Sequence, residues 1–411
     1  MEQTWRWFGK NDKITLSMLR QIGVEGIVTA LHDVPNGEVW SQEKICDLKQ
    51  FIEHEGLRWS VVESLPVAES IKYGGPDREQ LIENYKQSLI NLASQDIHVV
   101  CYNFMPVLDW ARTDLLHPNP NGTSNLFFSH AQFAYFDICI LKRKGAENDY
   151  APEVLAEVES LREQLTPEDE HRLVENIIVK TQGFVSGNIK EDDEHPVELF
   201  RQLLALYKGI TKEQLRENMR YFLEAIMPVC EEYDMYMCVH PDDPPFPILG
   251  LPRIVNCQDD IDWLFKAVDN PRNGLTFCAG SLSAGAHNDV VAMARKYAHR
   301  TWFVHMRSCK VFPNGDFTEA SHLGGRANLI ELARIFEQEC LNRARDFRAG
   351  RYPNYQASTF IDIPMRVDHG MTMLGDEHRG YNAGYSFLGR MFALAQVQGM
   401  LATVHRELGI S

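Results

Sequence analysis

Four short apolar segments in the second half of the chain each end at, or just before, a residue that can bind a metal ion. The segment MYMCVH ends at His240, GLTFC at Cys278 and TWFVH at His305, while Asp368 follows the apolar residues of IDIPMRV. All four segments have strand character. Because a parallel barrel presents its functional groups at the C-terminal ends of its strands, the four side chains are expected to meet above one rim. Spacings of about 38, 27 and 63 residues exclude a local zinc-finger clip.

Strand and helix patterns alternate along the whole chain. Segments with strand composition are 4–8, 25–31, 57–64, 98–104, 235–240, 275–278, 301–306 and 359–367. Helical patterns separate most of them: Thr211 and Gln214 form a capping box, and apolar residues follow at steps of four and three. Pro228 is expected to kink that helix near its end. This order predicts an α/β fold, a (β/α)₈ TIM barrel, in a single domain spanning residues 1–411.

One connection is far longer than a barrel requires. The fourth and fifth predicted strands lie about 130 residues apart, whereas a crossover between parallel strands needs about a dozen residues. We therefore expect residues 110–209 to form a helical insertion after the fourth strand, beginning with the turn-rich HPNPNGTSN. An insertion at this point stands over the C-terminal mouth of the barrel. It either covers the site or contacts another subunit, and both alternatives stay open.

Charge and cysteine usage limit the class of protein. The net charge of −16 argues against a surface for nucleic acid or anionic lipid, which would need a basic face. We find no apolar run of the length of a membrane span and no signal peptide in MEQTWRWFGKND. The nine cysteines include no CxxC pair, which favours reduced thiols. We expect a soluble cytoplasmic protein that binds neither nucleic acid nor a membrane.

Each candidate ligand taken alone also fits a structural role. A histidine at a strand end can simply be packed, and a lone cysteine such as Cys278 is more often a small buried apolar residue. Cys238 points to the same side as His240 and is compatible with the core. The common topological position of the four residues nevertheless favours a metal site.

Polar residues near the ligands are candidates for binding substrate. Arg307 lies on the same side of its strand as His305, where it could pair with a carboxylate, and Arg366 has the corresponding place beside Asp368. His32, just before the turn PNG, is a candidate for contacts with substrate hydroxyls. Further candidates at strand ends are Arg6, Asp33, Glu63 and Asn103, and Asp316 and His322 lie in a loop (315–325) that could close on substrate.

Longer blocks of the sequence resemble the D-mannonate dehydratase family of the hexuronate pathway. These blocks are ALHDVPNGEVW (30–40), WSVVESLPVAESIKYG (59–74), CYNFMPVLDWARTDL (101–115), CVHPDDPP, FCAGSLS, FVHMRS and RVDHG, and the similarity runs from WRWFG (5–9) to GYSFLGRMFALAQVQG (384–399). The resemblance implies a TIM barrel similar to the xylose-isomerase-like group and a Mn²⁺ or Fe²⁺ cofactor. It also implies dehydration of D-mannonate to 2-dehydro-3-deoxy-D-gluconate, in the catabolism of glucuronate.

The same resemblance implies roles for individual residues. The metal ligands fall on the four residues named above, and acid–base catalysis falls on His369 and on a tyrosine that follows it. We expect that tyrosine to be Tyr385, in NAGYSFLGR, with Tyr381 as the alternative. Dehydration of a 2,3-dihydroxy acid removes the proton on C2 and expels hydroxide from C3, which requires a base, an acid and a cation that stabilises the developing negative charge.

Three other functions compete with this interpretation. A metal-dependent sugar isomerase on the same barrel is disfavoured by the thiol ligand, because such isomerases generally hold their metals with carboxylates. A zinc hydrolase or repair endonuclease is disfavoured by the net charge of −16, and a non-catalytic metal-binding protein would show no turnover. We expect a small-molecule sugar acid as the partner, and a homo-oligomer, first of all a dimer.

Overall fold

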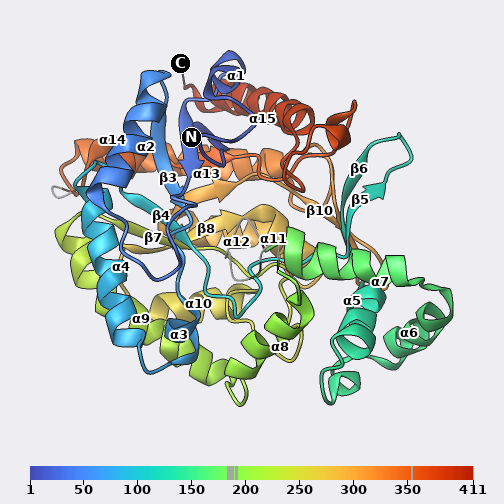
Figure 1. The fold of residues 1–411 in the computed structure, drawn as a ribbon. Helices are drawn as coiled ribbons and strands as arrows, with labels where there is room; N and C mark the ends of the chain where they lie inside the picture. Colours follow the sequence, from blue (N-terminus) through green and yellow to red (C-terminus); the bar gives the residue numbers. More distant parts are fainter. Residues whose placement is uncertain (183–188, 190–192, 353–354, 411) are drawn as a thin grey trace.

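The computed structural model describes residues 1–182, 189, 193–352 and 355–410. Within these residues, eight parallel strands close into a barrel in the order β1-β12-β9-β8-β7-β4-β3-β2 (Figure 1). The strands are β1 (Glu2–Arg6), β2 (Gly26–Thr29), β3 (Arg58–Glu63), β4 (Val99–Tyr102), β7 (Tyr236–Val239), β8 (Asn273–Cys278), β9 (Thr301–His305) and β12 (Pro364–Arg366). The predicted TIM barrel is confirmed, and each strand overlaps its prediction. The eighth is shorter than predicted, because residues 359–361 belong to helix α14 (Ala357–Ile361).

Helices cover the outside of the barrel. They are α1 (Leu16–Gln21), α2 (Gln42–His54), α3 (Glu69–Tyr73), α4 (Arg78–Ala93), α9 (Lys212–Glu232), α10 (Gln258–Ala267), α11 (Ala279–Ala284), α12 (Val290–Tyr297), α13 (Leu329–Arg348) and α15 (Phe387–Leu408). The predicted capping box is present at the start of α9, where Thr211 and Gln214 exchange hydrogen bonds of 3.2 Å, and Pro228 lies inside the helix. Apolar faces of these helices and of the strands form the main core.

The interior of the barrel is filled rather than open. Apolar side chains from several strands form a second cluster there, among them Val28, Val61, Val99, Tyr236 and Phe303. Cys238 belongs to this cluster and is completely buried, which confirms it as a core residue. Because the interior is packed, functional groups are left to the C-terminal rim.

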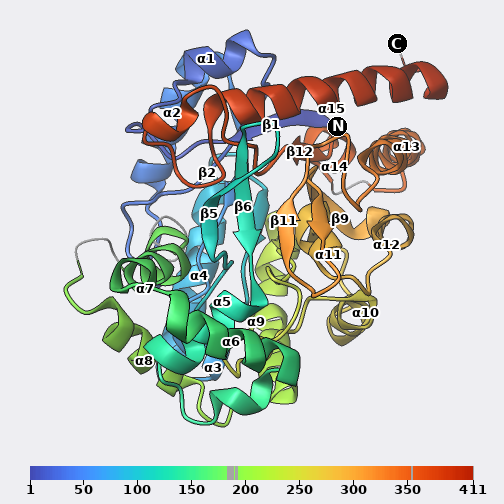
Figure 2. The ribbon, with the colours of Figure 1, turned by 90° about the vertical axis from the view of Figure 1, so that its right-hand side faces the viewer.

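The long insertion begins with a β-hairpin that the sequence analysis did not predict. Strands β5 (Asp114–Pro118) and β6 (Ser124–Phe128) flank the predicted turn, and β6 pairs with β11 (Phe317–Glu319), which pairs with β10 (Cys309–Val311). The result is a four-stranded antiparallel sheet of order β10-β11-β6-β5, and Figure 2 shows β6 beside β11. Phe128 stacks on Phe317 across this pair, with ring centroids 5.2 Å apart.

Helices follow the hairpin in the described part of the predicted insertion. It contains α5 (His130–Tyr135), α6 (Pro152–Gln164), α7 (Pro167–Val174) and α8 (Pro196–Leu206), with π-helical turns η1 (Phe136–Ile140) and η3 (Glu175–Lys180) and the short helix η2 (Ala146–Asp149). These helices share a core of their own with the loop after β7. Figure 1 shows them beside the barrel as a separate lobe, in green.

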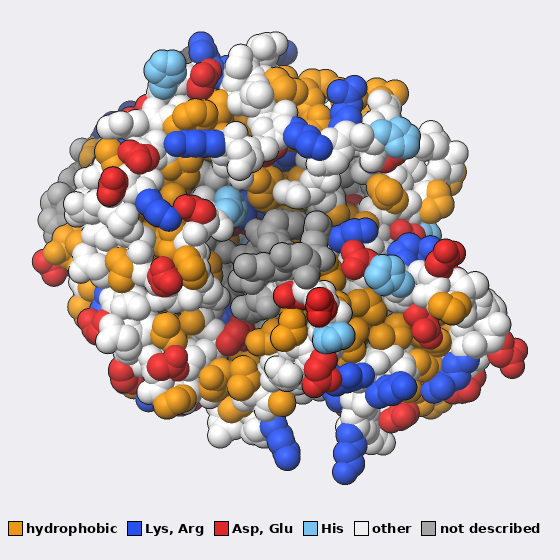
Figure 3. All heavy atoms as spheres, in the orientation of Figure 1, with side chains coloured by type: hydrophobic (Ala, Val, Ile, Leu, Met, Phe, Trp, Pro, Cys, Tyr) orange, Lys and Arg blue, Asp and Glu red, His pale blue; other side chains and the backbone are white. Residues whose placement is uncertain are grey.

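Helix α15 has the composition of a membrane span but packs as part of the fold. Among the described residues it is the one helix long and apolar enough to cross a membrane, yet 44% of its apolar window is buried. It contacts α13, and Arg390 within it is buried, which is typical of a core helix. On the face shown in Figure 3, acidic and basic side chains are interspersed rather than gathered by sign.

Candidate active site and metal centre

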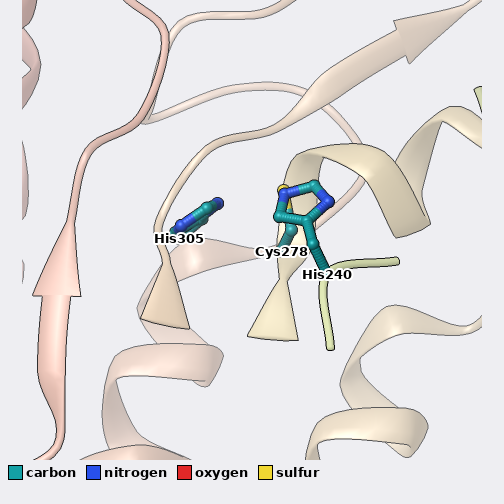
Figure 4. A group of neighbouring side chains, drawn as sticks. All are labelled: His240, Cys278 and His305. Carbon is teal, nitrogen blue, oxygen red and sulfur yellow. The ribbon is translucent and has the colours of Figure 1, made fainter. Parts of the chain in front are cut away.

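Three of the four predicted ligands come together at the ends of neighbouring strands. His240 directly follows β7, Cys278 ends β8 and His305 ends β9. Strands β8 and β9 pair in a register that places Cys278 opposite His305. One ligand atom from each of the three residues, hereafter the ligand trio, lies within 4.8 Å of the others. Figure 4 shows the three side chains gathered above the strand ends.

The chemistry of the ligand trio fits a transition-metal ion. Burial alone would raise the pKa of the Cys278 thiol, but Arg307 and then His240 outweigh it and hold that pKa well below its ordinary value. This direction favours the thiolate, the form that binds metals. His305 is completely buried, and among the described residues its Nδ1 has no hydrogen-bond partner. Two imidazoles and a thiolate suit Mn²⁺, Fe²⁺, Co²⁺ or Zn²⁺ far better than Mg²⁺ or Ca²⁺.

Asp368 lies beside the ligand trio. It follows β12 by two residues, with a left-handed backbone of φ 61°. Its Oδ2 is 3.8 Å from the sulfur of Cys278 and 3.7 Å from Nδ1 of His305. The two carboxylate oxygens accept hydrogen bonds from Arg307 and Arg366. The carboxylate is thus close enough to share an ion with the ligand trio, although it lies outside the 4.8 Å group.

Arg307 holds this half of the site together. Its Nε donates to Asp368, its Nη1 to Glu319 at 2.9 Å, and its Nη2 to Asp243 at 2.7 Å and Ser281 at 2.9 Å. Every nitrogen of the guanidinium is therefore engaged. A substrate carboxylate could bind Arg307 only by replacing one of these partners, so the predicted substrate contact stays a prediction.

Arg366 is engaged in the same way. Its Nε lies 2.9 Å from Glu63 Oε2 and 3.1 Å from His305 Nε2, and its Nη2 donates to Glu63 Oε1 at 2.7 Å. Its remaining nitrogen, Nη1, donates to Asp368. The register of β9 and β12, with His305 opposite Arg366, creates this arrangement. Arg366 consequently orients both a ligand of the trio and the neighbouring carboxylate.

The two predicted acid–base residues face each other. The rings of His369 and Tyr385 lie 5.1 Å apart at 87°. Nδ1 of His369 lies 3.2 Å from Glu319 Oε1, and its Nε2 lies 3.8 Å from Asp368 Oδ1. Burial raises the pKa of Tyr385 to about 12, so the phenol keeps its proton at neutral pH. Tyr381 is only half-buried and packs against the main core, which favours Tyr385 as the tyrosine of the site.

One pocket brings His240 together with Asp368, His369 and Tyr385, whereas Cys278 and His305 lie outside its lining. It is lined by Arg6, Glu63, Ser64, Asn103, Asp109, Trp110, His240, Asp243, Arg307, Arg366, Asp368, His369 and Tyr385. The predicted mouth residues Arg6, Glu63 and Asn103 are therefore part of it. His32 is exposed and outside this lining, with its ring 6.0 Å from that of Phe8.

The remaining candidates serve other contacts. Asp33 is exposed and pairs with Lys44 at 2.7 Å. Asp316 accepts from the backbone N–H of His130 at 2.8 Å, which ties the β10–β11 turn to the insertion. His322 is buried, with Nε2 2.9 Å from the carbonyl oxygen of Val367, and supports the backbone next to Asp368.

Sequence reasoning missed several polar residues of the site, of which Glu319 is the most informative. Its carboxylate contacts His369, accepts from Arg112 at 2.9 Å and accepts from Arg307. Burial opposes ionisation, but Arg307, then His369 and Arg112, lower the pKa of Glu319 to about 2. Asp243 accepts a hydrogen bond from Arg112 at 2.7 Å. In the sequence it was considered only as part of the turn CVHPDDPP. A predicted strand in GDFTE would have pointed to Glu319.

Comparison with known proteins identifies the family. Residues 1–410 match the D-mannonate dehydratase (UxuA) family. The mannonate dehydratase of Marinomonas sp. (strain MWYL1) is 47% identical over 411 residues, covering 100% of this chain and 99% of that protein. The mannonate dehydratase of Chromohalobacter salexigens is 42% identical, with both chains covered completely.

Solved structures agree with this relationship. The crystal structure of mannonate dehydratase from Streptococcus suis serotype 2 is similar with a TM-score of 0.76 and 31% identity, covering 100% of this chain and 96% of that one. A D-tagatose 3-epimerase-like protein has a TM-score of 0.50 at 10% identity, covering 99% of this chain and 100% of that one. At that identity the likeness concerns the barrel fold alone.

Proposed function

Since the chain belongs to the D-mannonate dehydratase family, we propose that it is a hydro-lyase that converts D-mannonate to 2-dehydro-3-deoxy-D-gluconate and water with Mn²⁺ or Fe²⁺. The observation that carries this proposal is the position of the ligand trio beside a pocket that His240 shares with Asp368 and with the facing pair His369 and Tyr385. Neither a sugar isomerase nor a hydrolase requires that pairing of groups. The family match and the full-length identities support the same reaction.

The metal-binding part of the proposal assigns four ligands. His240, Cys278 and His305 would hold the ion together with Asp368, whose carboxylate lies beside them. The ion would act as a Lewis acid that stabilises negative charge on the substrate oxygens of C1 and C2. Arg307 fixes the thiolate and the carboxylate from one side, because its Nη2 lies 3.4 Å from the Cys278 sulfur and its Nε contacts Asp368.

The proton transfers fall to the facing pair. Glu319 is a carboxylate, so the ring nitrogen that faces it, Nδ1 of His369, is the protonated one. Nε2 is then the nitrogen available to accept the proton from C2. Tyr385 keeps its phenolic proton and would donate it to the hydroxide that leaves C3. A base and an acid on two sides of one pocket match the requirement of the reaction.

The setting of the enzyme is also part of the proposal. None of the nine cysteines forms a disulfide, which supports a reducing compartment such as the cytoplasm. We expect a homo-oligomer, with a dimer as the first expectation. Sedimentation measurements of the purified protein test this expectation. His32, Arg307 and Arg366 stay candidates for substrate contacts, and for Arg307 such a contact would require exchange of an existing hydrogen bond.

A panel of aldonic acids tests the function. Purified protein with added Mn²⁺ should release a 2-keto-3-deoxy acid from D-mannonate, detected by its keto group, while His369→Asn under the same conditions should not. Aldoses serve as the comparison, because a sugar isomerase would turn them over. No turnover of D-mannonate together with good turnover of a neutral sugar would overturn the proposal.

A further inference from the structure

The substrate of the proposed reaction brings a carboxylate into a buried pocket, and a buried charge needs a partner. Three guanidinium groups line that pocket, those of Arg6, Arg307 and Arg366. The inference below rests on the proposed function and concerns which of the three receives the acid. The existing partners of each group decide the answer.

Two of the three are already paired with carboxylates. Arg307 and Arg366 donate from every nitrogen, to Asp368 and to other buried acceptors. Breaking one such buried, charge-assisted hydrogen bond would leave an unpaired acceptor behind, which is costly. A new carboxylate therefore gains little from approaching Arg307, and at Arg366 it would compete with Glu63 and Asp368 for a charge that these two carboxylates already pair.

Arg6 differs from both. It ends β1 and is 5% exposed, and among the described residues its Nε is buried without a hydrogen-bond partner. Its Nη1 lies 3.3 Å from Glu63 Oε2, but Glu63 already receives two shorter hydrogen bonds from Arg366, of 2.7 and 2.9 Å. The charge of Arg6 is thus only partly used by the protein itself.

The position of Arg6 suits the acid end of the substrate. Glu63 Oε2, which Arg6 contacts, also lies 3.7 Å from Nε2 of His305, so one oxygen atom separates Arg6 from the ligand trio. The backbone oxygen of Arg6 accepts from Arg390 at 3.0 Å, and Arg390 also bonds the backbone of Tyr385 at 3.1 Å. The backbone of Arg6 is therefore held next to that of Tyr385, and its guanidinium lies 5.3 Å from the ring of Phe8, which is 5.0 Å from the ring of Tyr385.

We propose that Arg6 binds the C1 carboxylate of the substrate, and that this contact makes the site select sugar acids over neutral sugars. A guanidinium that lines the pocket and is only partly paired offers a carboxylate a charge-assisted and geometrically specific partner. The contact fixes C1 on the side of the ligand trio, and it leaves C2 and C3 to the facing pair His369 and Tyr385.

The test compares a charged with a neutral ligand on the metal-loaded enzyme. A 3-deoxyaldonate lacks the leaving hydroxyl, so it binds without turnover, and the matching 3-deoxyalditol differs from it only at C1. In Arg6→Gln, calorimetry should show affinity for the acid reduced roughly 10- to 100-fold, as for loss of a charged hydrogen bond. Affinity for the alditol and the bound metal per chain should be unchanged. KM for D-mannonate should rise by a similar factor.

Two further variants make the outcome decisive. Arg6→Lys keeps the charge without the planar fork, so its affinity for the acid should lie between those of the wild type and Arg6→Gln, and it decides the matter if Arg6→Gln does not fold. Arg366→Gln, the matched control, should instead lower bound metal, because Arg366 contacts His305 and Asp368. Unchanged acid affinity, or equal losses for acid and alditol, would overturn the role of Arg6. A wild type without turnover of D-mannonate would contradict the proposed function instead.

Discussion

The parallel barrel and the antiparallel sheet above it contribute to the site in different ways. The barrel supplies the candidate metal ligands through strand register, as in the pair Cys278 and His305. The antiparallel sheet supplies a carboxylate, Glu319, that contacts His369, the proposed base. In the barrel, the position of a side chain follows from the strand topology. In the antiparallel sheet, it depends on two hairpins that lie about 190 residues apart in sequence. We therefore predict that substitutions of site residues in the barrel abolish activity, whereas substitutions in the antiparallel sheet only reduce it.

The largest effect is expected from the metal ligands on the barrel rim. Protein stripped with a chelator should lose measurable activity, and Mn²⁺ should restore it. Equimolar Zn²⁺ should inhibit the restored enzyme, because the Cys278 thiolate binds Zn²⁺ more tightly than Mn²⁺. Cys278→Ser should weaken metal binding and reduce the inhibition by Zn²⁺. Full activity in protein shown by elemental analysis to be free of metal would contradict this expectation.

The acid–base pair is expected to have the next largest effect. Tyr385→Phe and His369→Asn should each lower kcat by roughly 10²–10⁴-fold, the usual contribution of a positioned acid or base. Bound metal, measured by elemental analysis, should persist in both variants. Tyr381→Phe is the matched control and should keep near-normal kcat, since Tyr381 lies outside the pocket lining. The reverse result for the two tyrosines would show that the assignment is wrong.

The barrel was predictable from sequence because its constraints are local and repeated. Each strand is a short apolar segment, and closure of the barrel places a side chain at the C-terminal end of a strand on one rim. His240, Cys278 and His305 were found for this reason. The acid–base residues came instead from the resemblance of RVDHG and NAGYSFLGR to a family, since neither residue ends a strand.

The antiparallel sheet was not predictable on those grounds. Strands β10 and β11 have three residues each, too few to show an alternating pattern. Strand β5, DLLHP, includes residues of the predicted turn and carries no long apolar run. The loop 315–325 was singled out for Asp316 and His322, but Glu319 between them is the residue that contacts His369. It pairs with Cys309 of β10, and the neighbouring Phe317 and Thr318 pair with the distant strand β6. Pairing between distant segments leaves little signal in the sequence of either one.

Glu319→Gln is expected to have an intermediate effect, because it keeps the shape of the side chain and removes its charge. A neutral amide no longer favours a protonated Nδ1 on His369, so kcat should fall roughly 10- to 100-fold, as is typical for residues that orient catalytic groups. KM should change little. Asp316 lies on the same hairpin but contacts His130 rather than the pocket. Asp316→Asn should therefore leave kcat near the wild-type value. Equal kcat values for the two variants would mean that the sheet does not position the base.

The smallest effect is expected from replacing one glycine by alanine in each of the two regions. Gly122 in the β5–β6 turn has a φ of +81°, whereas Gly399 lies inside α15. A Cβ atom at either position would meet no atom within 4 Å. Gly122→Ala should therefore lower the free energy of unfolding by about 1 kcal/mol through backbone strain. Gly399→Ala should raise it by up to about 1 kcal/mol, because alanine favours helix.

Urea unfolding followed by tryptophan fluorescence measures both changes, and kcat should stay unchanged in each variant. The turn at Gly122 lies at the end of the hairpin away from the pairing of Phe128 with Phe317, so strain there should not reach Glu319. A loss of kcat in Gly122→Ala without a loss in Gly399→Ala would show that the hairpin transmits its conformation to the base. The sheet would then take part in catalysis as a whole rather than through one carboxylate.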